Sequence, residues 1–320
     1  MELGRLKEEG TLTTKKLIFY CNEMTSVAHA LANSPSAHDM LFGKIRWNSF
    51  EDGLPDLHIE NAEAIAGADV TFLAHFTPAN LFGQIAAIYA IPRHRARSFK
   101  LILPYFPPGT KERVIEYGDI ATAKTLARML SAIPLSQNGP TEIVMFDIHA
   151  LSEQFYFEDT VLPRLESAMR LFKLRLHTLP DRNNIAIAFP DEGARKRFGR
   201  QFTEFPTIEC RKARDGAKRS VYIVEGNPKD KHAIIVDDID KTCGTKLACK
   251  NALSEAGADT VSSYSTHGVY PEESWRKMIS AGFKHIWITD SCPTMAQGLR
   301  SAGPFEIISL APEIERIIKT

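Results

Sequence analysis

Short runs of apolar, largely β-branched residues alternate along the chain with longer segments of helical period. Eight runs predict strands, at 16–21, 69–75, 99–106, 142–148, 184–189, 232–238, 259–266 and 284–290. The segments between them predict helices at 22–33, 79–91, 118–132, 163–171, 191–201, 245–256, 271–281 and 311–319. Several strand runs are almost wholly apolar, as strands are when helices cover both faces of their sheet. The alternation predicts an α/β fold with mostly parallel sheets.

The pattern and the chain length of 320 residues predict two such sheets in tandem, since a domain usually takes roughly 100–200 residues. We expect a first domain over 1–160 and a second over 161–306. The tail, 307–320, offers one more strand and helix that either domain could accommodate, a return to the first being one prediction. Ligands of open parallel sheets bind beyond the carboxyl ends of the strands. Polar residues that directly follow an apolar run are therefore the candidates for function.

Composition narrows the classes of partner. Lysine plus arginine number 39, as do aspartate plus glutamate, and this balance does not favour a nucleic acid or a membrane surface. No apolar stretch approaches the roughly 18 residues of a membrane span. The amino-terminal residues lack an apolar targeting region. The five cysteines contain no CxxC pair and predict reduced thiols, so we expect a cytoplasmic protein. They are Cys21, Cys210, Cys243, Cys249 and Cys292.

The sharpest chemical signal is the segment IIVDDIDKTCGTKLACKNAL, residues 234–253. An apolar strand ends in Asp237 and Asp238, whose carboxylates can accept hydrogen bonds from the vicinal hydroxyls of a sugar. Thr242, Cys243, Gly244 and Thr245 follow, at the start of a predicted helix. The free N–H groups and the dipole of a helix start favour a phosphate there, and glycine allows close approach. The segment therefore predicts a site for a sugar phosphate.

Plainer interpretations of this segment stay open. The two aspartates can be simple loop residues, and Thr245 can be only the N-cap of its helix. The segment is not a Walker A loop, because GxxxxGK[ST] is missing.

Two acids, a short spacer and T-x-G-T resemble the phosphoribosyl diphosphate (PRPP) loop of the type I phosphoribosyltransferase fold. Further segments, in order, resemble the ribose-phosphate pyrophosphokinases (PRPP synthetases). They are FEDGLPDLHIENAEAIAGADVTFLAHF (50–76), GDIATAKTLARMLS (118–131), MFDIHA (145–150), FPDEGARKRF (189–198), STHGVYPEESW (265–275) and TDSCP (289–293). The resemblance covers nearly the whole chain. It implies two tandem type I phosphoribosyltransferase-like domains and an enzyme that moves the β,γ-diphosphate of ATP to the C1 hydroxyl of ribose 5-phosphate.

The chain is most similar to the class II, plant-type branch of that family, through PYFPPGTKERVIEYGDIATAKTLAR and FDIHALSEQFYFEDTVLP. Class I enzymes carry Y-x-R-Q-D-R-K in their nucleotide loop, and the arginine–glutamine pair is absent here. The class II resemblance implies activity without obligatory inorganic phosphate, weaker inhibition by ADP and a broader range of nucleotide donors.

The resemblance also implies roles for four polar residues. His149 would contact the metal or the ATP triphosphate, and Asp191 would bind Mg²⁺, a hard cation that takes carboxylates, waters and phosphates. Lys212 and Arg214 would stabilise the negative charge of the transferring phosphates. Each has a plainer alternative: a hydrogen-bonded structural histidine, a helix N-cap and a solvated basic turn, respectively.

Two other segments would serve ATP. Phe50 and Asp52 resemble the adenine-contact segment, which the family takes from a neighbouring subunit, so a homo-oligomer is implied; Phe50 can equally be a core residue. Lys111 and Arg113 would serve the ATP phosphates. One position departs from the family, because Lys241 stands where class I loops commonly carry an acid.

Three interpretations of function follow. The first is an active, Mg²⁺-dependent, class II-like PRPP synthetase acting on ATP and ribose 5-phosphate. The second is a catalytically silent regulatory subunit of the same fold. Such subunits typically carry insertions in the nucleotide or catalytic loop, and this chain shows no such insertion. The third is a phosphoribosyltransferase, which normally needs only one domain of roughly 200 residues.

Overall fold

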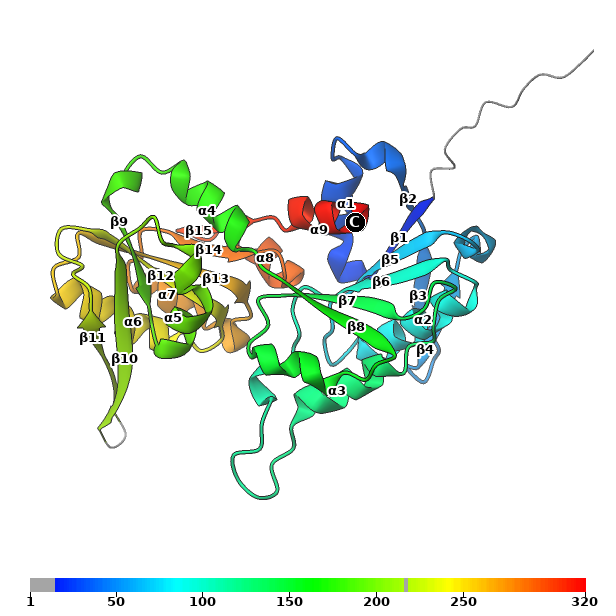
Figure 1. Ribbon diagram of the computed structural model, residues 1–320, viewed down its shortest axis with the longest axis horizontal. Helices are drawn as coiled ribbons and strands as arrows, with labels where there is room; N and C mark the ends of the chain where they lie inside the picture. Colours follow the sequence, from blue (N-terminus) through cyan, green and yellow to red (C-terminus); the bar gives the residue numbers. More distant parts are fainter. Residues whose placement is uncertain (1–14, 216–217) are drawn as a thin grey trace, which may run out of the picture.

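The computed structural model describes residues 15–215 and 218–320, with the side chains of 213–220 outside the description (Figure 1). The first of its two large sheets has the strand order β2-β1-β5-β6-β7-β8, and every pairing in it is parallel. Its strands are β1 (Lys16–Tyr20), β2 (Met40–Phe42), β5 (Asp69–Leu73), β6 (Ser98–Ile102), β7 (Thr141–Phe146) and β8 (Val161–Glu166). The helices of this half are α1 (Thr25–Ala32), α2 (Leu81–Arg93) and α3 (Thr122–Ser131). A separate antiparallel hairpin joins β3 (Ile45–Ser49) to β4 (Pro55–Ile59).

The second large sheet has the order β11-β10-β9-β12-β13-β14-β15, parallel except for the β10–β11 hairpin. Its strands are β9 (Ile185–Phe189), β10 (Thr207–Asp215), β11 (Lys218–Glu225), β12 (His232–Asp240), β13 (Thr260–Gly268), β14 (Ile286–Thr289) and β15 (Phe305–Ile308). The later helices are α4 (Met169–His177), α5 (Glu192–Phe198), α6 (Gly244–Glu255), α7 (Trp275–Ser280), α8 (Pro293–Leu299) and α9 (Ala311–Lys319). Together the two sheets and their helices form the predicted α/β fold.

Single turns of 3₁₀ helix connect several of these elements. They are η1 (Asn22–Met24), η2 (Ala37–Asp39), η3 (Ala62–Ile65), η4 (Gly109–Lys111), η5 (Leu151–Tyr156), η6 (Arg182–Asn184), η7 (Gly199–Gln201) and η8 (Pro271–Glu273). Of these, η4 and η5 matter for function, because both follow strands of the first sheet at its carboxyl edge.

The two halves exchange helices. Helix α4 follows β8 of the first sheet, yet its buried Phe172 stacks on Tyr264 of the second sheet, with ring centroids 4.0 Å apart. Helix α9 follows β15 of the second sheet, yet its Ile314 and Ile317 belong to the core of the first. Figure 1 shows α9 lying beside α1, and contacts between these two helices agree. Helix α4, which follows the last strand of the first sheet, thus packs on the second half. Helix α9, which follows the last strand of the second sheet, packs on the first half.

One predicted helix, 163–171, is wrong in its first part. Residues 161–166 form β8, the edge strand of the first sheet, and the helix begins only at Met169. Pro163 has no N–H to donate, which an edge strand tolerates and a helix interior does not. Helix α8 and the short β2–β4 strands were not predicted, because each is too brief to show a clear period.

Candidate active site

The carboxyl ends of the two sheets meet at β7 and β13. The Thr266 hydroxyl donates to Asp147 Oδ2 at 2.7 Å, and His267 Nε2 lies 2.9 Å from the carbonyl oxygen of Phe146. Both histidine and threonine are buried. Because ligands of parallel sheets bind at carboxyl edges, the residues that surround this junction form the candidate site.

His149 and Asp238 meet beside this junction, from opposite halves. His149 Nδ1 lies 2.7 Å from Asp238 Oδ2, and Arg197 Nη1 bonds the same oxygen at 3.2 Å and the His149 carbonyl at 3.0 Å. The Asp238 hydrogen bond raises the pKa of His149. Burial acts to raise the pKa of Asp238, but His149 and Arg197 outweigh it and lower that pKa. The cluster therefore favours a positively charged, half-exposed imidazole at the site.

The two adjacent acids divide between two places, since neighbouring residues of a strand point to opposite sides. Asp238 faces His149, whereas Asp237 lines a hollow of about 140 Å³ together with residues 239–246. Removal from solvent and the charge of Asp238 raise the pKa of Asp237 well above its usual value. Asp237 is thus the acid of the pair that faces the predicted sugar phosphate site.

The predicted phosphate cradle is the turn that starts α6. Cys243 holds a left-handed φ of 65° and immediately precedes the helix, whose first turn has no side-chain cap. Its thiol is buried, and burial raises the pKa of that thiol to about 11. Thr242 and Gly244 are exposed and Thr245 is half-buried, so the turn offers backbone N–H groups and hydroxyls to an anion. Thr245 is not the N-cap, so the simple capping alternative is wrong.

A buried ion pair supports the cradle from below. Lys246 Nζ lies 3.0 Å from Asp240 Oδ2 and also donates to Ser265 Oγ and to the Tyr264 carbonyl. The Tyr270 hydroxyl donates to the same Asp240 oxygen at 2.8 Å. Every hydrogen of the ammonium has a partner, as a buried charge requires. This network fixes the end of β12 and the start of α6.

Asp191 and Lys212 form an ion pair on the second half, 2.8 Å apart. Asp191 also accepts from the Ala194 N–H at 3.0 Å, so it is the N-cap of α5, as the structural alternative predicted. Burial opposes the change, yet the Lys212 hydrogen bond lowers the pKa of Asp191. Arg214 lies in β10, but its side chain is outside the described residues.

The segment 105–113 brings the first half to the site. Gly109 lies beside Glu153 and His149, since a Cβ built there would be in ordinary van der Waals contact, 3.4 Å from Glu153 Oε2 and 3.6 Å from the Cβ of His149. Thr110 accepts a hydrogen bond of 2.6 Å from Lys241 of the second half. Lys111 and Arg113 are exposed, and Arg113 pairs with Glu112 at 3.3 Å.

Phe50 and Asp52 are not brought to this site. They lie in the turn between β3 and β4, which Figure 1 places far from the second half. Phe50 is 58% exposed, so the alternative that it is a core residue is wrong. Asp52 accepts from the Leu54 N–H at 3.0 Å, which stabilises the turn.

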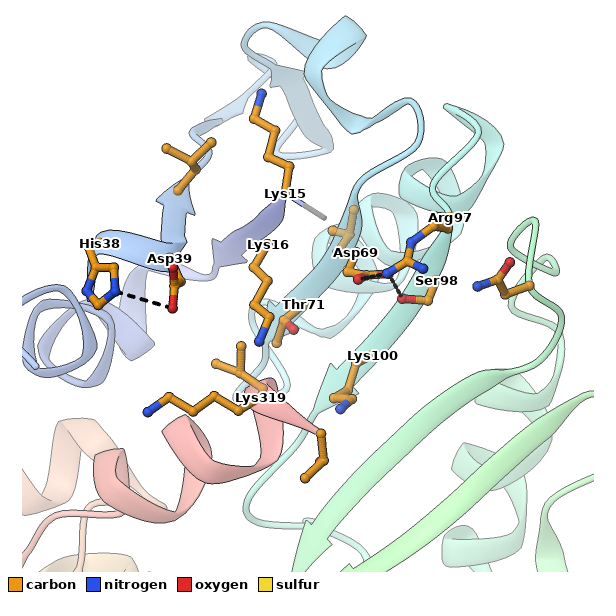
Figure 2. Close-up of a pocket in the computed structure, with 15 residues that line it drawn as sticks. Lys15, Lys16, His38, Asp39, Asp69, Thr71, Arg97, Ser98, Lys100 and Lys319 are labelled. Carbon is orange, nitrogen blue, oxygen red and sulfur yellow. Dashed lines mark hydrogen bonds and ion pairs between the residues drawn. The ribbon is translucent and has the colours of Figure 1, made fainter. Parts of the chain in front are cut away.

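A cavity of about 700 Å³ lies elsewhere, at the amino edge of the first sheet (Figure 2). Its lining carries several basic residues, but three of them make contacts that serve the fold. Arg97 pairs with Asp69, Lys100 bonds Glu142 and the last turn of α9, and Lys319 pairs with Glu315. The strand ends that carry the chemistry are at the opposite edge, and we do not assign the active site to this cavity.

Two residues of the site were not singled out from the sequence. Arg197 closes the FPDEGARKRF segment, and its position in that motif was the available signal. Glu153 is fully buried beside Gly109, accepts from the Ala150 N–H at 2.9 Å, and burial raises its pKa to about 7. Its contact is visible only in three dimensions.

The chain is a parallel α/β protein whose facing strand ends bring together the uncapped start of α6, an aspartate pair and a histidine of raised pKa. No protein-family model matches the chain. It is 47% identical over 322 residues to ribose-phosphate pyrophosphokinase 3, mitochondrial, of Spinacia oleracea, covering 98% of this chain and 79% of that protein. It is 48% identical to ribose-phosphate pyrophosphokinase 4 of Oryza sativa subsp. japonica, covering 93% of each.

The crystal structure of phosphoribosylpyrophosphate synthetase from Mycobacterium smegmatis matches with a TM-score of 0.80 at 20% identity, covering 96% of this chain and 98% of that one. That match supports the fold. The relatives at 47% and 48% identity place the chain plainly: it belongs to the ribose-phosphate pyrophosphokinase family, and the plant-type branch fits it.

Proposed function

We propose that this enzyme transfers the β,γ-diphosphate of ATP to the C1 hydroxyl of ribose 5-phosphate, giving PRPP and AMP. A bond forms between the C1 oxygen and the β-phosphorus, and the bond from that phosphorus to the α,β-bridging oxygen breaks. The observation that carries the proposal is the position of the α6 cradle and Asp237 on one half, across from His149 and segment 105–113 on the other.

The roles follow from what each group can offer. The N–H groups at 242–245 suit the 5-phosphate, and Asp237 suits a ribose hydroxyl. His149, whose pKa Asp238 raises, suits the triphosphate, and Lys111 and Arg113 lie exposed on the segment that would cover it. Lys212 stands in an ion pair and would exchange its carboxylate partner for phosphate oxygens as charge builds on them. Arg214 shares its strand, and we propose the same task for it.

Mg²⁺ fits the residues present. Within the described residues, three or more His, Cys, Asp or Glu side chains are nowhere grouped as a metal cage. Mg²⁺ commonly needs only one or two carboxylates and takes its remaining ligands from waters and substrate phosphates. Asp191, with its lowered pKa, would supply a carboxylate, and His149 would be a second candidate ligand. The ion would neutralise charge on the transferring group.

We also propose that the enzyme works as a homo-oligomer in which Phe50 and Asp52 reach the nucleotide of a neighbouring subunit. A large aromatic side chain that is 58% exposed at a hairpin turn is suited to such a contact. Size measurement in solution, together with Phe50→Ala, tests this: the variant should raise the KM for ATP and leave the KM for ribose 5-phosphate unchanged.

The cellular compartment is a separate proposal. In the part of the chain that the structure describes, every helix is too short or too polar to cross a membrane. All five cysteines are buried and none forms a disulfide bond, and we propose a cytoplasmic location. Relatives of similar identity carry mitochondrial and chloroplastic names, so fractionation of cells is the test.

The activity is tested by incubating purified protein with ATP, Mg²⁺ and ribose 5-phosphate and following AMP and PRPP, with and without inorganic phosphate. Both products without added phosphate are expected, as the plant-type resemblance implies. Activity only with phosphate would retain the reaction and remove the phosphate-independent assignment. No AMP and no PRPP from folded protein would overturn the proposed function in favour of a silent regulatory subunit.

A further inference from the structure

Lys241 is the one position where the cradle departs from the family pattern, and the structure gives it a specific contact. Its ammonium donates to Thr110 Oγ1 at 2.6 Å, across 131 residues of sequence and between the two halves. Thr110 lies in η4, the turn of segment 105–113 that the proposed function assigns to ATP. A side chain of the ribose phosphate loop thus holds the nucleotide segment directly.

The backbone of Lys241 is itself fixed. Its carbonyl oxygen accepts from the Ser274 hydroxyl, and the Cys243 thiol approaches the same oxygen at 3.8 Å. The base of this side chain is therefore anchored to the second half, and only its ammonium crosses to the first.

On its other side, η4 packs against the first half. A Cβ built at Gly109 would lie in ordinary van der Waals contact with Glu153 and His149, so these two residues are neighbours of the turn. The turn is therefore held between His149 and Glu153 on one side and Lys241 on the other. Losing the lysine contact would release one of the two sides.

The charge on Lys241 is also unusual for this site. Lys212 and Arg197 each face a carboxylate, whereas the Lys241 ammonium donates to an uncharged hydroxyl. Half-burial lowers the pKa of Lys241, and the charge of Asp238 partly opposes that change. Partial burial disfavours the charged form of the Lys241 ammonium, and its hydrogen-bond partner is not an acid that would compensate. We therefore infer that Lys241 has a role other than a surface ion pair.

We propose that Lys241 is a positioning residue: through Thr110 it ties the nucleotide segment to the ribose phosphate loop, so that the two substrates meet at one distance and orientation. This inference rests on the proposed function. Alignment of two bound reactants is worth a large factor in rate, and small displacements reduce it. The tie acts on the reaction step rather than on the binding of either substrate alone.

The test compares Lys241→Met, Thr110→Val and the double variant, with Thr110→Ser as the matched control that keeps the hydroxyl. A hydrogen bond to a charged group justifies an expected fall in kcat of about tenfold for each single variant. The double variant should fall no further, because both changes remove the same contact. Thr110→Ser, which keeps the hydroxyl, should restore most of the kcat that Thr110→Val loses. The Kd of ribose 5-phosphate without nucleotide should stay at its wild-type value in Thr110→Val.

Other outcomes overturn the proposal in distinguishable ways. A Thr110→Val enzyme with wild-type kcat beside an impaired Lys241→Met enzyme would mean that Lys241 acts on a substrate directly. Fully additive losses in the double variant would also exclude the tie. A wild-type protein that forms neither AMP nor PRPP would remove the proposed function itself, and this inference with it.

Discussion

The carboxyl ends of β7 and β14 share the same hydrogen-bonding arrangement around an aspartate, but the side chains beside them differ in chemistry. Asp147, after β7, accepts from the Ser167 hydroxyl and the Ala168 N–H. Asp290, after β14, accepts from the Ser309 hydroxyl and the Leu310 N–H. In both places a buried carboxylate fixes the start of the helix that crosses to the other half. The same device thus builds both strand ends.

Two residues further on, the two ends diverge. His149 is half-exposed and the Asp238 hydrogen bond raises the pKa of its imidazole, whereas Cys292 is buried and burial raises the pKa of its thiol to about 12. Cys292 lines a cavity of about 710 Å³ whose described lining includes Glu23 and Glu273 but no lysine or arginine. Phosphate chemistry needs cations, so the shared aspartate arrangement alone does not make a site. The neighbouring side chains decide whether a strand end can bind phosphate.

The largest expected effect comes from exchanging the two diverging residues for alanine. His149→Ala should lower kcat by at least about 100-fold, the scale on which a charged group in direct contact with the reacting phosphates contributes. Cys292→Ala, the matched change at the other strand end, should leave kcat at its wild-type value. Steady-state kinetics on both variants decide this. Equal losses, or a fully active His149→Ala enzyme, would contradict the difference drawn here.

The next effect separates the two adjacent acids. Asp238→Asn leaves the partly buried Arg197 without its carboxylate and should lower the free energy of unfolding by about 3 kcal/mol. Asp237→Asn should cause no such loss, because the raised pKa of Asp237 means that its charge burdens the folded state at neutral pH. It should instead raise the KM for ribose 5-phosphate. Urea unfolding of both variants measures the contrast, which equal destabilisation would remove.

A smaller effect is expected when the two equivalent aspartates, Asp147 and Asp290, are replaced. Asp147→Ala should cost more stability than Asp290→Ala by about 1 kcal/mol, because Asp147 also accepts from Thr266 of the second half. Thermal or urea unfolding gives the difference. Thr266→Val should bring the two costs together if that third hydrogen bond is the reason. A larger cost for Asp290→Ala would show that the two arrangements are not equivalent.

The smallest effect is one of pH. The folded-state pKa of His149 lies above its ordinary value of 6.5, so its stabilising contribution is complete below pH 6.5 and disappears as the pH rises through the raised value. Asp238 behaves oppositely: its folded pKa lies below 3.8, and its contribution is lost as the pH falls through that lower value. Wild-type protein should therefore exceed His149→Gln in melting temperature most between pH 4 and 6.5. A pH-independent difference would mean that the pair is not ionic.

The sequence predicted eight strands of the two large sheets and the site in part, whereas β10 and β11 were not among these eight predicted strands. The apolar residues 233–236 and 185–189 made buried strands the natural prediction, and the acid pair and T-x-G-T loop followed from their position at a strand end. The packing of α4 on the second half was not predicted, because an amphipathic helix indicates an apolar face without its partner, whereas a return of the tail helix to the first half was one of the two placements expected. Nor was the Lys241–Thr110 contact, since it depends on how two distant turns meet.

Residue types also limited the prediction for β8. Its proline and charged residues hide a strand that lies at a sheet edge, and the helical period of the following residues extended the predicted helix backward. For Arg197, the motif was visible but its two partners, His149 and Asp238, come from different strands. Sequence motifs indicated which segments contribute to the site, and tertiary contacts determine which of their side chains take part.

Both substrates are expected to meet between the facing carboxyl edges of the two sheets. A structure of the protein with Mg²⁺, ribose 5-phosphate and a non-hydrolysable ATP analogue should show the 5-phosphate on the backbone N–H groups of residues 242–245 and the triphosphate beside His149, with Thr110 still bonded to Lys241. Either substrate bound instead in the amino-edge cavity of Figure 2, with the α6 cradle empty, would exclude that arrangement.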